Sequence, residues 1–201
     1  MATVTILGST GSIGLSALRV MRALGGEFDV YGLACRSSVA ALDAQIREFR
    51  PSVVAVASPA PGGIEALRSA HPRVEFLCGD EGVIELCGRD VDVLVSAIVG
   101  AAGLRPAVTA IPHIKRLALA NKETLVMAGD IVMEMARDYG VELVPVDSEH
   151  SALFMLLEGR RKEDVSRLIL TASGGSLRDR AADELPFITP GEALAHPTWD
   201  M

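Results

Sequence analysis

The chain has 201 residues, 49% of them hydrophobic, which is enough to bury a sizeable core as one domain or as one domain with part of a second. Its net charge of -7 argues against a nucleic-acid-binding surface, because such a surface needs clustered lysine and arginine. No apolar run approaches the roughly 20 residues that span a bilayer, so we expect a cytoplasmic protein that binds small molecules.

Short apolar runs recur through the first two-thirds of the chain and predict strands. The runs are TVTIL, FDVYGLA, SVVAVA, VEFL, VDVLVSAIV and RLALA. They are continuous rather than alternating, which is typical of parallel strands buried on both faces. Amphipathic segments such as SIGLSALRVMRAL lie between them and predict helices. This alternation predicts a Rossmann-like, doubly wound α/β fold with a mostly parallel sheet.

The alternation of apolar strands and amphipathic helices gives way to polar motifs near residue 145. A helix is expected from about Thr124 to Tyr139, and ELVPVDSEHSALF then begins as a strand and turns into a helix. Farther on, VSRLILTASGG resembles another strand that ends in a glycine-rich loop. We therefore expect a nucleotide-binding domain over residues 1–144 and an incomplete α+β catalytic domain over residues 145–201.

A helix start is predicted in TPGEALAHP. Thr189 is the expected N-cap, and Pro190 suits the first helical position because it needs no hydrogen-bond acceptor there. Glu192 lies three residues after Thr189, which is the spacing of a capping box.

The segment TILGSTGSIG places glycines three apart directly after the first strand. We expect Gly8 to permit a sharp turn, Gly11 to let a pyrophosphate approach the backbone, and Gly14 to let the next helix pack closely. Hydroxyl groups that can bond phosphate oxygens lie on Ser9, Thr10 and Ser12. The motif predicts a dinucleotide site, although glycine-rich turns also occur for structural reasons alone.

The end of the second strand indicates which dinucleotide binds. An NAD site would place an acidic residue there, whereas YGLACRSS offers Arg36, Ser37 and Ser38. A cation suits the extra phosphate of NADP(H), so NADP(H) is favoured. The alternative is that Arg36 is a solvated surface charge.

Two polar motifs follow later strands. In LANKE, Lys122 is a candidate electrostatic catalyst, and Asn121 and Glu123 lie beside it. In VPVDSEHSA, Asp147 and Glu149 are two residues apart, so at the end of a strand both carboxylates would project to one side. Such an oxygen pair suits Mg²⁺ or Mn²⁺. The alternative is an ordinary helix N-terminus.

Polar residues near the end of the chain are less specific. Ser173 in TASGG could bind a substrate phosphate through its hydroxyl group and the neighbouring backbone N–H groups, or the loop could be purely structural. In AHPTWDM, His196 reads by itself as a surface residue and Trp199 as a packing residue.

The motifs GSTGSIG, AIVGAAGL, LANKE, VDSEHSA, TASGG and HPTW together resemble the 1-deoxy-D-xylulose 5-phosphate reductoisomerases, along all 201 residues. The resemblance implies an enzyme of the non-mevalonate isoprenoid pathway. It uses NADPH and Mg²⁺ or Mn²⁺ to convert 1-deoxy-D-xylulose 5-phosphate, a phosphorylated sugar, to 2-C-methyl-D-erythritol 4-phosphate. Members of the family form homodimers.

The resemblance also implies roles for individual residues. Cofactor contacts would come from Gly8, Thr10, Gly11, Ser12, Ile13, Arg36, Ser37, Ser38, Asn121 and Glu123. Substrate contacts would come from Lys122, Ser148, Glu149, Ser173, His196 and the flap residue Trp199. The implied metal ligands are Asp147 and Glu149, which with Lys122 form the implied catalytic set.

Two features depart from the family pattern. Cys35 and Arg36 stand where the family often has glycine with lysine or asparagine. The family continues beyond Met201 into a third metal carboxylate and a helical domain, so we expect metal binding to be weakened in this chain. One alternative is therefore a non-catalytic NADPH-binding module. A second is a semialdehyde-dehydrogenase-type enzyme, whose nucleophile would have to be one of the cysteines, Cys35, Cys78 or Cys87.

Overall fold

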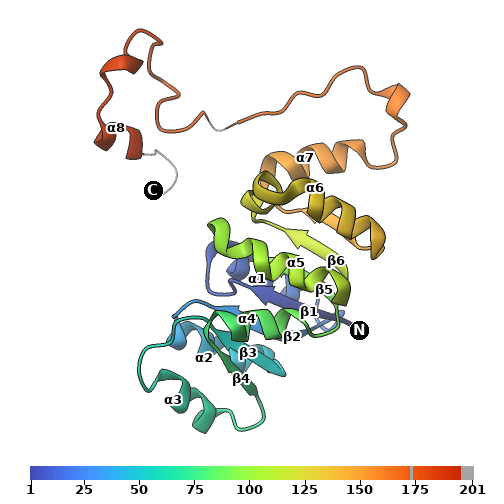
Figure 1. Ribbon diagram of the computed structural model, residues 1–201, viewed down its shortest axis with the longest axis vertical. Helices are drawn as coiled ribbons and strands as arrows, with labels where there is room; N and C mark the ends of the chain where they lie inside the picture. The colour runs from blue at the N-terminus through green and yellow to red at the C-terminus, as the bar shows by residue number, and fades with distance from the viewer. Residues whose placement is uncertain (173, 196–201) are drawn as a thin grey trace. The chain divides into compact units, whose positions relative to one another are not determined.

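A computed structural model describes residues 1–172 and 174–195. The chain divides into two compact units, Met1–Asp147 and Ser148–Met201. Figure 1 shows the helices and strands that each unit contains. Within the described ranges, no helix is both long enough and apolar enough to cross a membrane.

The first unit is built on a parallel sheet of seven strands in the order β4-β3-β2-β1-β5-β6-β7. The strands are β1 (Ala2–Leu7), β2 (Phe28–Cys35), β3 (Val53–Val56), β4 (Glu75–Cys78), β5 (Val91–Ser96), β6 (Ile114–Leu119) and β7 (Glu142–Pro145). Six of them overlap the predicted apolar runs, and β7 overlaps the strand expected at the start of ELVPVDSEHSALF. The chain builds outward from β1 to one edge and then from β5 to the other. The strand order therefore reverses between β1 and β5, which is where open α/β sheets bind ligands.

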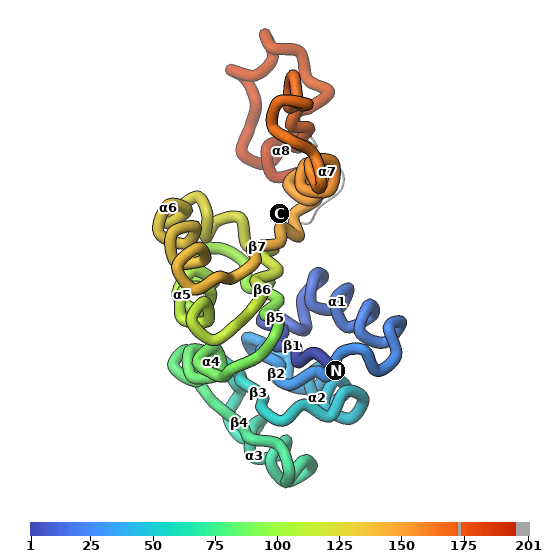
Figure 2. Tube along the Cα trace, turned by 90° about the vertical axis from the view of Figure 1, so that its right-hand side faces the viewer, coloured from blue at the N-terminus to red at the C-terminus, as the bar shows by residue number. Residues whose placement is uncertain are grey.

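Helices cover both faces of this sheet, as Figure 2 shows. Helices α1 (Ser12–Ala23), α2 (Val39–Phe49) and α3 (Gly63–Ala70) pack on one face through buried side chains such as Leu18, Leu42 and Ile64. The other face is covered by α4 (Gly79–Cys87), α5 (Leu104–Ala110) and α6 (Lys122–Asp138). Short 3-10 turns precede and follow α5, η1 (Gly100–Gly103) and η2 (Ile111–His113). The doubly wound fold is thus confirmed.

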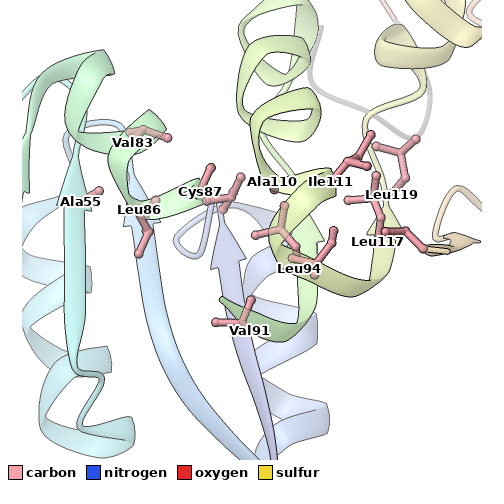
Figure 3. Packing of buried hydrophobic residues seen from close by; sticks show 14 of the residues in the cluster. Ala55, Val83, Leu86, Cys87, Val91, Leu94, Ala110, Ile111, Leu117 and Leu119 are labelled. Atoms are coloured by element: carbon pink, nitrogen blue, oxygen red, sulfur yellow. The ribbon is translucent and has the colours of Figure 1, made fainter. Parts of the chain in front are cut away.

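The core beneath α4, α5 and α6 explains why the strands are apolar throughout. Leu94 on β5 and Leu117 on β6 are fully buried and belong to one cluster with Leu86 on α4 and Ile111 beside α5 (Figure 3). Alternate residues of the same strands face the opposite cluster, so polar side chains would be buried on either side.

The second unit contains α7 (Ser148–Leu157), η3 (Lys162–Asp164), η4 (Leu185–Phe187) and α8 (Pro190–Leu194). The capping box predicted for α8 is present. The backbone N–H of Glu192 donates to Thr189 Oγ1 at 3.3 Å, and the backbone N–H of Thr189 donates to Glu192 Oε2 at 3.0 Å.

The strand predicted from VSRLIL is not formed. Leu168, Ile169 and Leu170 are more than half exposed, and no described residue of the second unit lies in a strand. Because a strand is stabilised by a hydrogen-bonded neighbour, an apolar, β-branched sequence alone does not form one.

Asp92 on β5 links three adjacent strands. It accepts hydrogen bonds from the backbone N–H of Thr3 on β1 at 2.8 Å and from Lys115 Nζ on β6 at 2.6 Å. The hydrogen bond from Lys115 and those from Thr3 lower the pKa of this carboxyl from 3.8 to about 2.

A group whose pKa is lowered by folding stabilises the protein above its unfolded pKa, and this contribution is lost as the pH falls through the folded pKa. We expect Asp92→Asn to lower the urea midpoint at neutral pH and to differ little from the parent at about pH 2. Urea titrations at both pH values test this. If Asp92→Asn had a urea midpoint lower than the parent's by the same amount at both pH values, the prediction would be contradicted.

Candidate functional site

The turn between β1 and α1 has the geometry that its glycines predict. Gly8 has a φ of +78°, and the backbone N–H groups of Gly8 and Ser9 both donate to Ala34 O at 2.9 Å. A Cβ on Gly8 would lie 2.5 Å from Ala97 O, and one on Gly14 would lie 2.3 Å from Gly8 O. The turn is therefore held tightly between β2 and β5, and α1 packs directly against it.

Helix α1 begins at this turn with exposed N–H groups. Gly11 is the N-cap, and the first intrahelical bond runs from the Leu15 N–H to Gly11 O at 2.9 Å. The N–H groups before Leu15 have no acceptor within the helix, and Gly11, Ser12 and Ile13 are exposed. Free N–H groups at the start of a helix, together with the helix dipole, can bind an anion such as a pyrophosphate.

A cavity of about 710 Å³ lies at this edge of the sheet. Its walls come from the β1–α1 turn, the residues after β2, β3 and β5, and the helices α4 and α5. Four of the predicted cofactor residues line it, namely Gly8, Thr10, Gly11 and Arg36. Its apolar lining includes Ala57, Val83, Ile84, Ile98 and Pro106. The volume and position fit a dinucleotide at the point where the strand order reverses.

The loop after β2 contributes only one of its predicted contacts to the cavity. Arg36 is exposed and lines the cavity, which suits a ligand of an extra phosphate. Ser37 and Ser38 are also exposed but are not among the lining residues, and Ser38 is the N-cap of α2.

Polar side chains that the sequence analysis did not single out also line the cavity. They are Ser58 after β3, Asp80 at the start of α4 and Arg105 on α5. The Arg105 guanidinium is paired with Glu81, with Nη2 2.9 Å from Oε2, and this hydrogen bond lowers the pKa of Glu81. The sequence held a signal for Ser58 and Asp80, because residues that follow the carboxyl ends of parallel strands lie at the same edge of a sheet.

Asn121 caps α6 and is 3% exposed. Its Oδ1 accepts from the backbone N–H of Thr124 at 2.9 Å, and its Nδ2 donates to Ile98 O at 2.7 Å and to Glu123 Oε2 at 3.1 Å. Neither Asn121 nor Glu123 is among the residues that line the cavity.

Lys122 and Asp147 lie together at the ends of neighbouring strands. Lys122 begins α6 after β6, and Asp147 follows β7. The distance from Lys122 Nζ to Asp147 Oδ2 is 3.0 Å, and the side chains are 59% and 15% exposed. The structure thus brings the predicted electrostatic catalyst and a predicted metal ligand together in the first unit.

The strand-based argument for the carboxylate pair is wrong. Strand β7 ends at Pro145, and Glu149 lies in the first turn of α7, where it accepts a hydrogen bond from Ser148 Oγ at 2.7 Å. The two-residue alternation that would place Asp147 and Glu149 on one side of a strand therefore does not apply.

The described residues do not by themselves form a metal centre, since none of their His, Cys, Asp and Glu side chains gather in a group of three or more that could hold a cation. Asp147 and Glu149 remain predicted ligands.

Three predicted substrate contacts, Ser173, His196 and Trp199, lie outside the described residues. Beside the first of them, Gly174 and Gly175 have φ values of +81° and +68°. Both glycines adopt a backbone conformation that other residues rarely adopt, so this loop depends on glycine.

The chain matches family models along most of its length. A model of 1-deoxy-D-xylulose 5-phosphate reductoisomerase matches residues 4–129, and a model of the C-terminal domain of that enzyme matches residues 143–201. Curated relatives that carry this name come from Chlorobium chlorochromatii, which is 51% identical, and Prosthecochloris aestuarii, which is 50% identical. Both alignments cover 100% of this chain and 53% of the relative.

Solved structures of reductoisomerases are similar to it as well. The enzyme from Zymomonas mobilis in complex with NADPH has a TM-score of 0.88 at 35% identity, over 98% of this chain and 52% of that one. A reductoisomerase in complex with NADPH, fosmidomycin and magnesium has a TM-score of 0.84 at 35% identity, over 100% and 52%. The chain belongs to the 1-deoxy-D-xylulose 5-phosphate reductoisomerase family, and it spans about half the length of the curated relatives that it matches.

Proposed function

We propose that this chain binds NADPH in the cavity at the β1–α1 turn and serves in the conversion of 1-deoxy-D-xylulose 5-phosphate to 2-C-methyl-D-erythritol 4-phosphate. The observation that carries the proposal is the cavity itself, which combines Gly8, the open N-terminus of α1 and Arg36 where the strand order reverses. The similarity to a reductoisomerase solved with NADPH supports it. Homodimerisation, which the family resemblance implies, remains a prediction for this chain.

Individual residues suit separate parts of the cofactor. The N–H groups of Ser12 and Ile13 would hold the pyrophosphate, since they lie at the start of α1. The Arg36 guanidinium would bind the 2′-phosphate. The apolar side chains of Val83 and Ile84, which also line the cavity, would cover the less polar parts of the cofactor. The close approach that Gly8 and Gly14 allow fits such a ligand.

Lys122 has the chemistry of an electrostatic catalyst. Its ammonium group would stabilise negative charge that develops on a substrate oxygen, and the ion pair with Asp147 orients it. When bound, NADPH supplies the hydride that reduces a carbonyl carbon of the rearranged substrate. Asp147 and Glu149 would bind Mg²⁺ or Mn²⁺, as the family resemblance implies, but the described residues do not complete that site.

The test is NADPH oxidation by the 201-residue chain, followed by absorbance, with 1-deoxy-D-xylulose 5-phosphate and Mg²⁺ present and with each omitted in turn. Turnover that requires both supports the proposal. A folded sample that binds NADPH without turnover supports a second candidate, a non-catalytic NADPH-binding module.

The structure argues against an enzyme with a cysteine nucleophile. Burial raises the pKa of the Cys35 thiol to about 11 and that of Cys87 to about 12, so neither forms the reactive thiolate readily. Cys78 is exposed at the end of β4 and is not among the residues that line the cavity.

We expect Arg36→Gln to weaken NADPH binding by about 10- to 100-fold and to leave NADH binding nearly unchanged, because a hydrogen bond to a charged group contributes about 1.5–3 kcal/mol. Fluorescence titration with each nucleotide measures this. The matched control is Arg73→Gln, which removes the same charge from an exposed position outside the cavity lining. Equal losses for NADPH and NADH would contradict a contact with the 2′-phosphate.

A further inference from the structure

The side chain of Gln45 on α2 reaches the turn between β1 and α1. Its Nε2 donates to Ser9 O at 2.9 Å, and the two residues are 6% and 0% exposed. A carbonyl oxygen can only accept a hydrogen bond, so the amide nitrogen of Gln45, and not its amide oxygen, faces Ser9. Because Ser9 is fully buried, solvent does not supply a replacement donor. Gln45 therefore provides the partner that a buried carbonyl requires.

Apolar side chains anchor α2 and thereby place this amide. Leu42 and Ile46 are 0% and 2% exposed and belong to the core on this face of the sheet. Leu42 lies three residues before Gln45, so the two share one face of the helix. A hollow of about 540 Å³ lies between α1 and α2, and its lining includes Gln45, Ser12 and Leu18. Contact between α2 and the turn therefore depends on the reach of a long side chain.

The hydrogen bond to Ser9 O also sets the direction of the next N–H group. Ser9 O and the Thr10 N–H belong to one planar peptide group, and the described residues contain no cis peptide bond, so the two point in opposite directions. The Thr10 N–H therefore points away from Gln45. Thr10 lines the cofactor cavity, whereas Gln45 does not. No described residue accepts a hydrogen bond from the Thr10 N–H, which leaves it available to a ligand.

We propose that Gln45 is a positioning residue that holds the Ser9–Thr10 peptide in the orientation that a bound pyrophosphate requires. The hydrogen bonds from the Gly8 and Ser9 N–H groups to Ala34 O fix the peptide groups before this one, but not the Ser9–Thr10 peptide itself. A peptide group that is not held can rotate and present its carbonyl oxygen, which repels a phosphate, in place of its N–H. This inference rests on the proposed NADPH site for its functional consequence.

The test compares Gln45→Met with the parent. Methionine has a similar length and volume but no amide, so the Ser9 carbonyl loses its donor. We expect NADPH and NADH to bind more weakly by the same factor, about 10-fold, because a buried acceptor without its donor costs on the order of a tenfold factor and both nucleotides contain the pyrophosphate. The nucleotide 2′-AMP has the adenosine and the 2′-phosphate but no pyrophosphate, so its affinity should be unchanged. Isothermal titration calorimetry measures all three affinities.

The same helix offers a matched control. Glu48 on α2 pairs with Arg22 on α1, with Arg22 Nη2 2.8 Å from Glu48 Oε2. Glu48→Gln removes this ion pair between the two helices without touching the turn, so we expect parental affinity for all three nucleotides. A milder variant, Gln45→Asn, guards against loss of folding, because it keeps the amide and is only one methylene shorter. It should weaken NADPH binding less than Gln45→Met does and should again leave 2′-AMP binding unchanged.

Amide hydrogen exchange reports on the turn directly. In the parent, the N–H groups of Gly8 and Ser9 are bonded to Ala34 O at 2.9 Å and should exchange slowly. In Gln45→Met both should exchange faster, because the turn has lost its contact with α2. The Ala120 N–H, which follows β6 in the same sheet, should exchange at the parental rate.

The outcomes separate the possibilities. If Gln45→Met loses as much affinity for 2′-AMP as for NADPH, the loss of structure is general and the positioning role is wrong. If Gln45→Met binds NADPH and NADH as the parent does, the Ser9–Thr10 peptide does not depend on Gln45 and the inference is likewise overturned. If the parent itself binds no NADPH, the proposed function fails, and the exchange rates of Gly8 and Ser9 in Gln45→Met still decide whether Gln45 holds the turn.

Discussion

Replacing Gly14 with alanine is expected to destabilise the first unit by about 2–4 kcal/mol and to abolish NADPH binding at micromolar concentrations. The new Cβ would lie 2.3 Å from Gly8 O, 2.6 Å from Ser9 Cα and 2.7 Å from Ser9 C. All three are backbone atoms of the turn, so no side chain can rotate away to relieve the clash. Helix α1 would have to move away from the turn, and the pyrophosphate site would be lost. Urea unfolding and NADPH titration measure the two effects.

Gly11→Ala is the matched control within the same turn. The nearest atom to a Cβ at Gly11 is Gly8 O at 3.4 Å, and the residue is exposed with φ of -81°. We expect it to lose no more than about 1 kcal/mol of stability, the usual cost of alanine at an N-cap, but to weaken NADPH binding, because the methyl group occupies the face that the phosphate approaches. If Gly14→Ala were as stable as Gly11→Ala, close packing of α1 would not be the reason for the third glycine.

Replacing Lys122 with alanine is expected to reduce turnover of 1-deoxy-D-xylulose 5-phosphate by about 100- to 1,000-fold, the usual effect of removing one preorganised electrostatic contact to a developing negative charge. NADPH affinity should change less than about twofold, because Lys122 is not among the residues that line the cavity. Steady-state NADPH oxidation and NADPH titration measure the two quantities. If the chain alone shows no turnover, a chimera that carries the remaining half of the Chlorobium chlorochromatii relative provides the assay.

The chain offers a close control for this lysine. Lys115 lies on the same strand as the residues that lead to Lys122, at the opposite end of β6, and it also pairs with a carboxylate, with Nζ 2.6 Å from Asp92 Oδ1. Lys115→Ala therefore removes the same charge and a similar ion pair far from the carboxyl ends of the strands. We expect its turnover to be unchanged. Unchanged turnover in Lys122→Ala would remove Lys122 from the mechanism.

Much of the first unit could be predicted because its signals are local or repeat at a fixed period. Six apolar runs and the start of ELVPVDSEHSALF identified the strands, and the glycines of TILGSTGSIG identified a turn whose backbone excludes a Cβ at Gly8 and Gly14. The capping box at Thr189 was correct for the same reason, since it involves groups only three residues apart. Such features depend on the backbone conformation of a few neighbouring residues.

The errors arose where a pattern depended on distant partners. The VSRLIL segment has the composition of a strand but has no described neighbour with which to pair. The Asp147 and Glu149 pair was placed on a strand because of its spacing, yet the chain turns into α7 between β7 and Glu149. Spacing gives a side-chain direction only once the secondary structure is known.

The sequence by itself thus determined the alternation of strands and helices, the tight glycine-rich turn and the family. Only the tertiary structure decided which strand ends lie side by side, and therefore that Arg105 and Ser58 line the same cavity as Arg36, and that Lys122 meets Asp147. It also decided that Asn121, at the start of α6, donates to Ile98 O after β5 and accepts from the N–H of Thr124. The reason is physical: periodicity and turn chemistry are set by residues a few positions apart, whereas these contacts form only when segments far apart in the chain are brought together by the packing of a common core.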